Sequence, residues 1–279
     1  MKYKIKSELV YEVYADTAFF LNIQVAKSRS QHVISELFTV SNNIVYKEFS
    51  LANNDTRFLK FNAKQGQTIQ INYQTEVEVF CKQISRNQLL QATAITDLDN
   101  EVLPFIAPSR HCESDKFIKF VNKEFGYYTS NFEKVLAIND WIFNNIDYTP
   151  GVTSSNTSAN DTLVQREGVC KDFAHLGIAL CRALDIPARY FTSYTYQLAP
   201  PDIHACFEAY IAGEWIVFDP TKLAPLNGLV KIANGKDATE APVASFYGNT
   251  YCTLMNIECI AIEPFEEIVW DGEVGGIVY

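Results

Sequence analysis

The central stretch of the chain, residues 168–184, reads Gly-Val-Cys-Lys-Asp-Phe-Ala-His-Leu-Gly-Ile-Ala-Leu-Cys-Arg-Ala-Leu. Its apolar residues recur every three or four positions, which predicts a buried helix. The helix is expected to end before Asp185-Ile186-Pro187, because proline cannot continue it. Cys170 therefore falls at or near the helix N-terminus, where free N–H groups and the helix dipole favour a thiolate.

Three strands are expected after this helix, over 188–194, 205–211 and 215–218, where aromatic and β-branched residues dominate. The short turn 212–214 joins the second strand to the third, which predicts a hairpin. His204 begins one arm of the hairpin and Asp219 ends the other. Because the two arms run antiparallel, these two side chains are expected to be neighbours.

Cys170, His204 and Asp219 are the residue types that acyl transfer needs. A thiolate attacks a carbonyl, an imidazole moves the proton, and a carboxylate orients the imidazole. Each also has a purely structural interpretation: a small buried cysteine, a hydrogen-bonded core histidine, and a turn-forming aspartate before Pro220. Their joint occurrence favours the catalytic interpretation.

In these segments the chain resembles the transglutaminase-like superfamily of thiol enzymes, whose core is related to papain. The matching stretches are 166–176, 182–190, His204-Ala205, Glu208 and 215–221, within about residues 110–225. The resemblance implies an α+β fold in which helices pack on an antiparallel sheet. It also implies Cys170 as the nucleophile, His204 as the general base and acid, and Asp219 as the residue that orients His204.

The chain departs from the family pattern at two positions. Cys206 stands two residues after the histidine, where the family usually has tryptophan, and this change is expected to alter the wall of the acyl site. Asp185 stands where a glycine usually precedes Ile-Pro-Ala-Arg, and it is interpreted as a change at a helix end.

The first 80 residues predict an antiparallel β-sandwich, because alternating segments recur between short polar breaks. The expected strands are Lys4–Tyr14, Phe19–Ala26, His32–Val40, Ile44–Phe49, Arg57–Ala63 and Thr68–Val79. We therefore predict an N-terminal β-sandwich domain over 1–100, without chemistry of its own, and a transglutaminase-like catalytic domain over 101–279. A β domain in this place is also what the family resemblance implies.

The remaining segments are interpreted more coarsely. Residues 82–112 are expected to form a connection, and residues 115–125 and 131–145 are expected to form helices. Residues 149–161 are expected to form a surface loop, which either lines the cleft or only connects its neighbouring elements. Residues 227–240 form a Gly/Asn-rich excursion, and 237–248 fit a short helix or a loop. A strand is expected over about 251–262, followed by an acidic tail.

The composition excludes several classes of partner. A net charge of −10 argues against nucleic acid and anionic membrane surfaces. No apolar run is long enough to span a membrane, and the N-terminus lacks a signal core, so a cytoplasmic protein is expected. The seven cysteines are then free thiols. Cys170, His175, Cys181, His204 and Cys206 match no recurrent zinc spacing, so neither a metal nor another cofactor is expected.

Two further donors are candidates for stabilising an oxyanion beside the backbone N–H of Cys170. These are Gln165 and Tyr148, and for Gln165 a solvated surface position is an equal alternative. Three functions remain open: a peptidase or amidase acting on a peptide or protein, a transglutaminase that uses an amine acceptor, and a non-enzymatic scaffold. The intact Cys, His and Asp disfavour the scaffold, and hydrolysis is preferred. The sequence does not fix the oligomeric state.

Overall fold

The computed structural model describes residues 1–41, 43–50, 55–268 and 275–279. The strands are β1 (Lys2–Val13), β2 (Thr17–Leu21), β3 (Gln31–Val40), β4 (Lys47–Ser50), β5 (Arg57–Ala63), β6 (Thr68–Val79), β7 (Lys82–Ile84), β8 (Asp147–Tyr148), β9 (Glu167–Gly168), β10 (Ala188–Thr195), β11 (Ile203–Ile211), β12 (Glu214–Phe218), β13 (Leu229–Gly235), β14 (Ala244–Tyr247), β15 (Thr250–Ala261) and β16 (Gly276–Val278). The helices are α1 (Arg86–Leu89), α2 (Ile118–Phe125), α3 (Asn131–Asn145), α4 (Ala159–Gln165) and α5 (Cys170–Arg182), with short 3₁₀ turns at Ile95–Asp97, Leu103–Phe105, Ser114–Lys116 and Leu226–Gly228.

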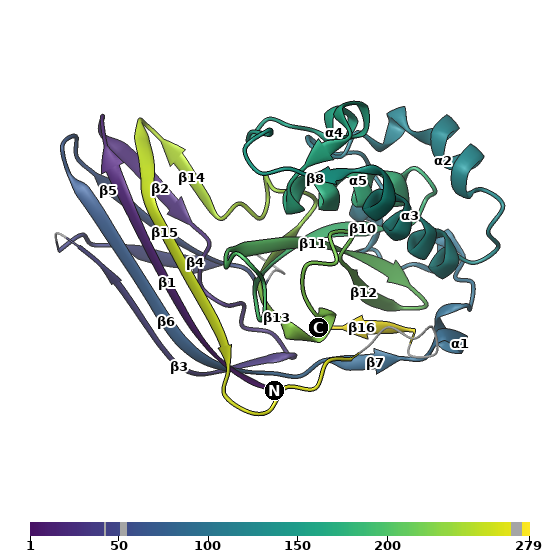
Figure 1. Ribbon diagram of the computed structural model, residues 1–279, viewed down its shortest axis with the longest axis horizontal. Coiled ribbons are helices and arrows are strands. Elements are labelled where there is room, and N and C mark those ends of the chain that lie inside the picture. Colours follow the sequence, from purple (N-terminus) through teal and green to yellow (C-terminus); the bar gives the residue numbers. More distant parts are fainter. Residues whose placement is uncertain (42, 51–54, 269–274) are drawn as a thin grey trace.

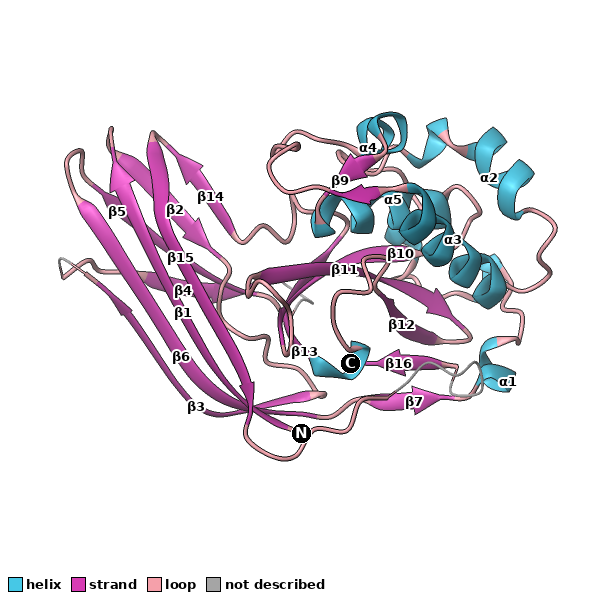
Figure 2. Cartoon of the chain, viewed as in Figure 1, coloured by secondary structure: helices cyan, strands magenta, loops and turns pink. Residues whose placement is uncertain are grey.

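A β-sandwich forms one side of the molecule, and a sheet covered by helices forms the other (Figures 1 and 2). The sandwich has two antiparallel sheets, in the orders β15-β1-β6-β3 and β14-β2-β5-β4. Alternate residues of β1 and β6 are buried, which is the period that a half-buried strand requires. The α+β class and the sandwich predicted from the sequence are therefore confirmed.

The sandwich is not made from the N-terminal residues alone, as the division at residue 100 assumed. Strand β15, near the end of the chain, pairs antiparallel with β1 from Tyr3↔Ala261 to Val13↔Thr250. Strand β14 pairs with β2 in the other sheet. In Figure 1 the yellow β15 lies beside the purple β1. Local strand patterns carry no information on such distant pairing, so a division by sequence order assigned both strands to the catalytic unit.

The second unit contains a four-stranded antiparallel sheet in the order β12-β11-β10-β13, against which α5 packs. Gly177 of α5 allows this close packing. A Cβ added at this position would lie 2.5 Å from the Phe207 ring of β11. The central helix predicted from the sequence thus lies directly on the sheet that carries His204.

Several local predictions needed correction. The excursion at 227–240 contains β13, an edge strand of the second sheet, and 237–248 contains a turn and β14 where a short helix or a loop was expected. The predicted loop 149–161 already includes the start of α4, and the predicted strand 19–26 ends at Leu21. The connection 82–112 contains β7, which pairs with β16 at the end of the tail. Two of the polar breaks between the predicted strands, at 41–43 and 52–55, and the acidic tail lie partly outside the described residues.

Buried hydrogen bonds join the two units. The Tyr194 hydroxyl of β10 donates to the Ile23 carbonyl at 2.6 Å, and the Tyr3 hydroxyl donates to the Asn227 carbonyl at 3.0 Å. The side chain of Gln31 accepts from the Lys231 N–H and donates to the Lys231 carbonyl. Because buried polar groups are costly to leave unpaired, separating the units would break a specific interface.

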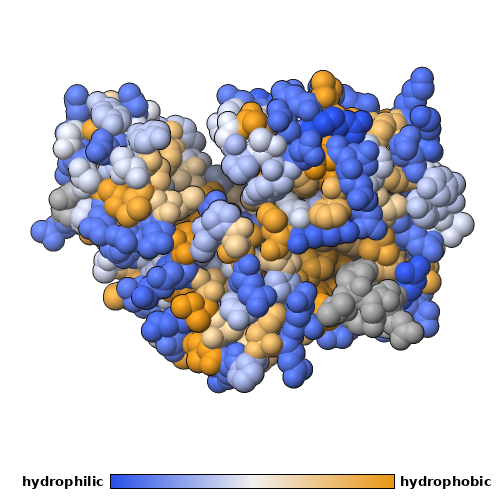
Figure 3. Space-filling model, viewed as in Figure 1, coloured by the Kyte–Doolittle hydropathy of each residue, from blue (hydrophilic) through white to orange (hydrophobic). Residues whose placement is uncertain are grey.

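Polar side chains dominate the face shown in Figure 3, and a furrow separates the two units at its upper edge. Among the described residues, no helix is both long and apolar enough to cross a membrane.

The turn between β11 and β12 offers a test of local strain. Both turn residues have positive φ angles, 52° at Ala212 and 85° at Gly213, as a type I′ hairpin turn requires. Alanine is disfavoured there, whereas asparagine tolerates this conformation. Ala212→Asn is therefore expected to raise the free energy of unfolding by about 0.5–1 kcal/mol. Chemical denaturation measures the change, and Ala212→Val should move it in the opposite direction.

Candidate active site

Cys170 is the first residue of α5, as the sequence predicted for a thiol at a helix N-terminus. The buried Asp172 organises this end of the helix. Its Oδ2 accepts hydrogen bonds from the Val169 N–H at 3.0 Å and from the Thr153 hydroxyl at 2.7 Å. A Cβ at Gly168 would lie 2.8 Å from the Cβ of Asp172. Glycine is thus needed here for a close contact within the protein, and Cys170 is held by a fixed helix start.

His204 lies near the start of β11 and Asp219 directly follows β12. Nε2 of His204 lies 2.8 Å from Oδ2 of Asp219, with both side chains buried. The other oxygen, Oδ1 of Asp219, accepts from the Thr221 N–H at 2.9 Å and the Thr221 hydroxyl at 2.7 Å. Since an ionised carboxylate only accepts, the Nε2 of His204 carries the hydrogen and Nδ1 remains for a second partner.

Electrostatics link this histidine to the thiol. Burial alone would lower the pKa of His204, but the Asp219 carboxylate and a hydrogen bond with Cys170 raise this pKa to about 10. Burial would likewise raise the pKa of Asp219, yet His204 and Thr221 hold it below its usual value. His204 is therefore favoured as a cation between the carboxylate and the sulfur.

The two oxyanion candidates differ in position. Burial and Cys170 raise the pKa of Tyr148 to about 12, and both the backbone and the side chain of Cys170 interact with its hydroxyl. The Tyr148 hydroxyl therefore lies beside the nucleophile and its N–H. Gln165 is an exposed residue at the end of α4, and no hydrogen bond ties its side chain to Cys170 in the described part of the chain. Tyr148 is the candidate that the geometry retains.

The two departures from the family pattern have structural explanations. Cys206 is fully buried in a cluster with Phe191, Val217, Leu229 and Ile277, so it fills the interior instead of forming an open wall of the acyl site. Asp185 has a φ of 59°, and the N–H of the next residue, Ile186, donates to the carbonyl of Cys181. This is the left-handed helix end where glycine is usual and aspartate is tolerated.

Sequence reasoning missed the residues that support the site. Thr221 holds Asp219, and Thr153 holds Asp172 from within the segment interpreted as a loop. A threonine two residues after an aspartate is a weak sequence signal for the contact between Thr221 and Asp219. No sequence pattern links Thr153 to Asp172. Among the residues that the structure describes, no three His, Cys, Asp or Glu side chains gather as a metal site would need.

Two family profiles match separate parts of the chain. Residues 119–220 match the profile of the transglutaminase-like superfamily, and 1–101 match that of the N-terminal domain of bacterial transglutaminases. A crystal structure from Cytophaga hutchinsonii, provisionally titled a cysteine protease, is 48% identical to this chain. It aligns over 100% of this chain and 97% of that one, with a TM-score of 0.97.

Two mycobacterial relatives are more distant. An uncharacterized protein of Mycobacterium leprae is 29% identical over 178 residues, which are 60% of this chain and 62% of the relative. An uncharacterized protein of Mycobacterium tuberculosis is 29% identical over 143 residues, 45% of each chain. The matches thus span less than two thirds of these relatives. The chain itself, by its two profile matches and its near-complete correspondence to the Cytophaga structure, belongs to the transglutaminase-like superfamily.

Proposed function

We propose that the protein is a thiol enzyme that hydrolyses amide bonds of peptide or protein substrates through an acyl-enzyme on Cys170. The observation that carries the proposal is the position of His204, which bonds Asp219 at 2.8 Å and interacts with the thiol of Cys170. This order of carboxylate, imidazole and sulfur is the arrangement that activates a cysteine nucleophile.

In the first half-reaction the Cys170 thiolate attacks the carbonyl carbon and forms a C–S bond, and the carbonyl oxygen takes the negative charge. The Cys170 N–H and the Tyr148 hydroxyl supply donors for that oxygen. His204 gives its proton to the leaving nitrogen as the C–N bond breaks. In the second half-reaction His204 takes a proton from water, the resulting hydroxide attacks the acyl group, and the C–S bond breaks to restore the thiolate.

The relative from Cytophaga hutchinsonii, 48% identical over nearly the whole chain, is provisionally titled a cysteine protease, which favours water as the acyl acceptor. The acceptor can be tested with a library of glutamine-containing peptides analysed by mass spectrometry, with and without added primary amine. Hydrolysis predicts free acid products in both samples. Amine conjugates in the second sample would instead assign amine transfer.

Cys170→Ala should abolish product formation, whereas Cys252→Ala, which removes a partly buried thiol on β15, should leave it unchanged.

Iodoacetamide at about pH 6 should modify Cys170 before the other thiols, because only a thiolate reacts readily. Burial raises the pKa of Cys81 and of Cys206, which slows their reaction. Faster modification of Cys81 or Cys206 would overturn the assignment of the nucleophile.

Tyr148→Phe tests the second oxyanion donor. Removing one such donor is expected to lower kcat by about ten- to a hundredfold, with little change in KM, because the oxygen becomes charged only after attack. Gln165→Ala, on the exposed end of α4, should leave kcat within about twofold as the matched control. Equal kinetics for Tyr148→Phe and the unmodified protein would remove Tyr148 from the mechanism.

A further inference from the structure

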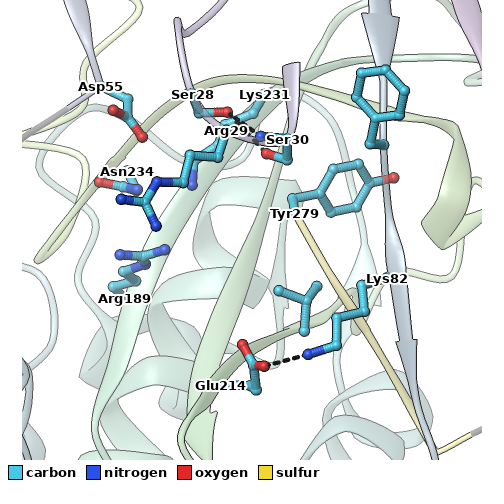
Figure 4. A pocket seen from close by; sticks show the side chains of 12 residues that line it. Ser28, Arg29, Ser30, Asp55, Lys82, Arg189, Glu214, Lys231, Asn234 and Tyr279 are labelled. Carbon is cyan, nitrogen blue, oxygen red and sulfur yellow. Dashed lines mark hydrogen bonds and ion pairs between the residues drawn. The ribbon is translucent and has the colours of Figure 1, made fainter. Parts of the chain in front are cut away.

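A cavity of about 710 Å³ lies between the two units, away from the candidate active site. Its lining includes Arg29 from the segment after β2, Arg189 of β10 and Lys231 of β13 (Figure 4). Tyr190, the neighbour of Arg189, faces α5, where its ring lies 5.0 Å from that of His175. Since successive strand residues point to opposite faces, Arg189 lies on the face of the sheet that α5 does not cover.

Lys231 is a buried cation without a hydrogen bond for its ammonium group in the described part of the chain. Its side chain is only 4% exposed, and the nearest carboxylate oxygen, Oε1 of Glu208, is 3.8 Å away. That Oε1 atom is itself buried and has no hydrogen-bond partner among the described residues. A buried charge is normally both paired and hydrogen-bonded, whereas the ion pair with Glu208, at 3.8 Å, leaves this ammonium group without a hydrogen bond in the described part of the chain.

The two arginines add charge at the same cavity. Nε of Arg189 donates to Oε2 of Glu208, and its guanidinium lies 4.1 Å from the centre of the Trp215 ring. Its terminal NH₂ groups make no hydrogen bond within the described residues. Arg29 makes no hydrogen bond or ion pair there either. In Figure 4 the Arg29 and Arg189 side chains both extend into the cavity, and no dashed line joins either of them to another of the residues drawn.

The acidic residues nearby do not neutralise this group. Glu214 is used by Lys82, at 2.6 Å. The three cations Arg29, Arg189 and Lys231 then have two acidic neighbours. These are Glu208, which lies behind the cavity, and Asp55, which lines it. Counted over side chains alone, the cations at the cavity therefore exceed the acids by one. The chain as a whole carries a net charge of −10, so its overall field repels anions. The local excess of positive side chains at the cavity has the opposite sign.

We propose that this cavity binds a small anionic ligand through its carboxylate or phosphate group, held between Arg29, Arg189 and Lys231. Guanidinium groups match the paired oxygens of either anion, and a buried ammonium supplies a point charge. The volume suits a ligand larger than a single ion, and Phe80 and Tyr279 offer apolar walls for the rest of it. The ligand would bridge the two units, since Arg29 belongs to one and Arg189 to the other.

This site is separate from the proposed function, because its lining contains none of Cys170, His204 and Asp219. The test is calorimetric titration of the full chain with inorganic phosphate, pyrophosphate and citrate. We expect saturable binding at one site per chain for at least one probe. Preference for pyrophosphate would identify a phosphate ligand, and preference for citrate a carboxylate ligand.

Variants decide whether the cavity is the site. Arg29→Gln changes an exposed residue and should weaken binding about tenfold, the usual effect of losing one charge-assisted hydrogen bond. Lys27→Gln, which removes the same charge two residues away and outside the cavity lining, should change the affinity less than twofold. Lys231→Met, of similar shape, should abolish binding, and Cys170→Ala should bind as the unmodified protein does.

The proposal fails if none of the probes gives saturable binding up to about 10 mM, since a site weaker than this is no better than nonspecific attraction. It also fails if Arg29→Gln binds as the unmodified protein does, or if Lys27→Gln weakens binding equally. Should Lys231→Met not fold, the comparison of Arg29→Gln with Lys27→Gln decides alone.

Discussion

Asp219→Ala is expected to lower kcat by roughly two to four orders of magnitude while the fold remains intact. Asp219 is the acceptor that fixes Nε2 of His204 at 2.8 Å, and Thr221 fixes Asp219 in turn. Without the carboxylate, the imidazole is free to rotate and to exchange tautomers, so Nδ1 no longer meets the thiol reliably. Steady-state kinetics measures the loss, and circular dichroism verifies the fold. Unchanged turnover would remove Asp219 from the proposed mechanism.

Thr221→Val is the graded control for this experiment. It removes the hydroxyl that donates to Oδ1 of Asp219 but keeps both the carboxylate and the Thr221 backbone donor. A milder fall in kcat, of about three- to tenfold, is therefore expected. If the two variants fall equally, the role of Asp219 is to maintain local structure and not to orient His204.

The same carboxylate predicts a dependence of stability on pH. The pKa of His204 is about 10 in the folded protein, above its ordinary value of 6.5, so protonation stabilises the native state. That contribution is fully present below pH 6.5 and is lost as the pH rises to about 10. The stability difference between the unmodified protein and Asp219→Ala should therefore shrink over this range, as denaturation at several pH values would measure.

The sequence predicted that Cys170, His204 and Asp219 lie together because each stands within or directly beside a short, regular element. The helical period of residues 173–184 places Cys170 at a helix start, and the turn at 212–213 places His204 beside Asp219. Tyr148 emerged only as one of two candidates. Its contact with Cys170 depends on the parallel pairing of β8 with β9, which brings Tyr148 opposite Gly168. Two residues of strand give no recognisable period.

The limits of the sequence prediction concern pairing between distant segments. The alternation of residues 251–262 predicted a strand, and this was sufficient to find β15 but not its partner β1, more than 230 residues away. Lys231 shows the same limit. The Gly/Asn-rich composition around it was interpreted as an excursion from the fold, whereas its strand β13 pairs with β10, and its backbone N–H donates to the side chain of Gln31 in the other unit. Composition reports local preference, and tertiary pairing overrides it.

These distant pairings determine what is expected of a chain that begins at Ser109. If the sandwich were self-contained, such a chain would keep a reactive Cys170. With β15 paired to β1 and β14 paired to β2, it is instead expected to be insoluble or to lack cooperative unfolding. The buried side chains Tyr3, Ile5 and Leu9 of β1 each contribute roughly 1.5–3 kcal/mol. A few such losses equal the whole net stability of a domain, about 5–15 kcal/mol.

Soluble yield, thermal unfolding and iodoacetamide labelling of Cys170 test this expectation. The control supplies residues 1–108 as a separate chain in the same cell. This chain restores β1 as the partner of β15, and it restores the Ile23 carbonyl that accepts a hydrogen bond from the Tyr194 hydroxyl. Recovery of soluble complex and of labelling would attribute the defect to the missing partners. A chain from Ser109 that unfolds cooperatively and labels at the normal rate on its own would show that the sheet carrying His204 needs neither β1 nor the interface at Ile23.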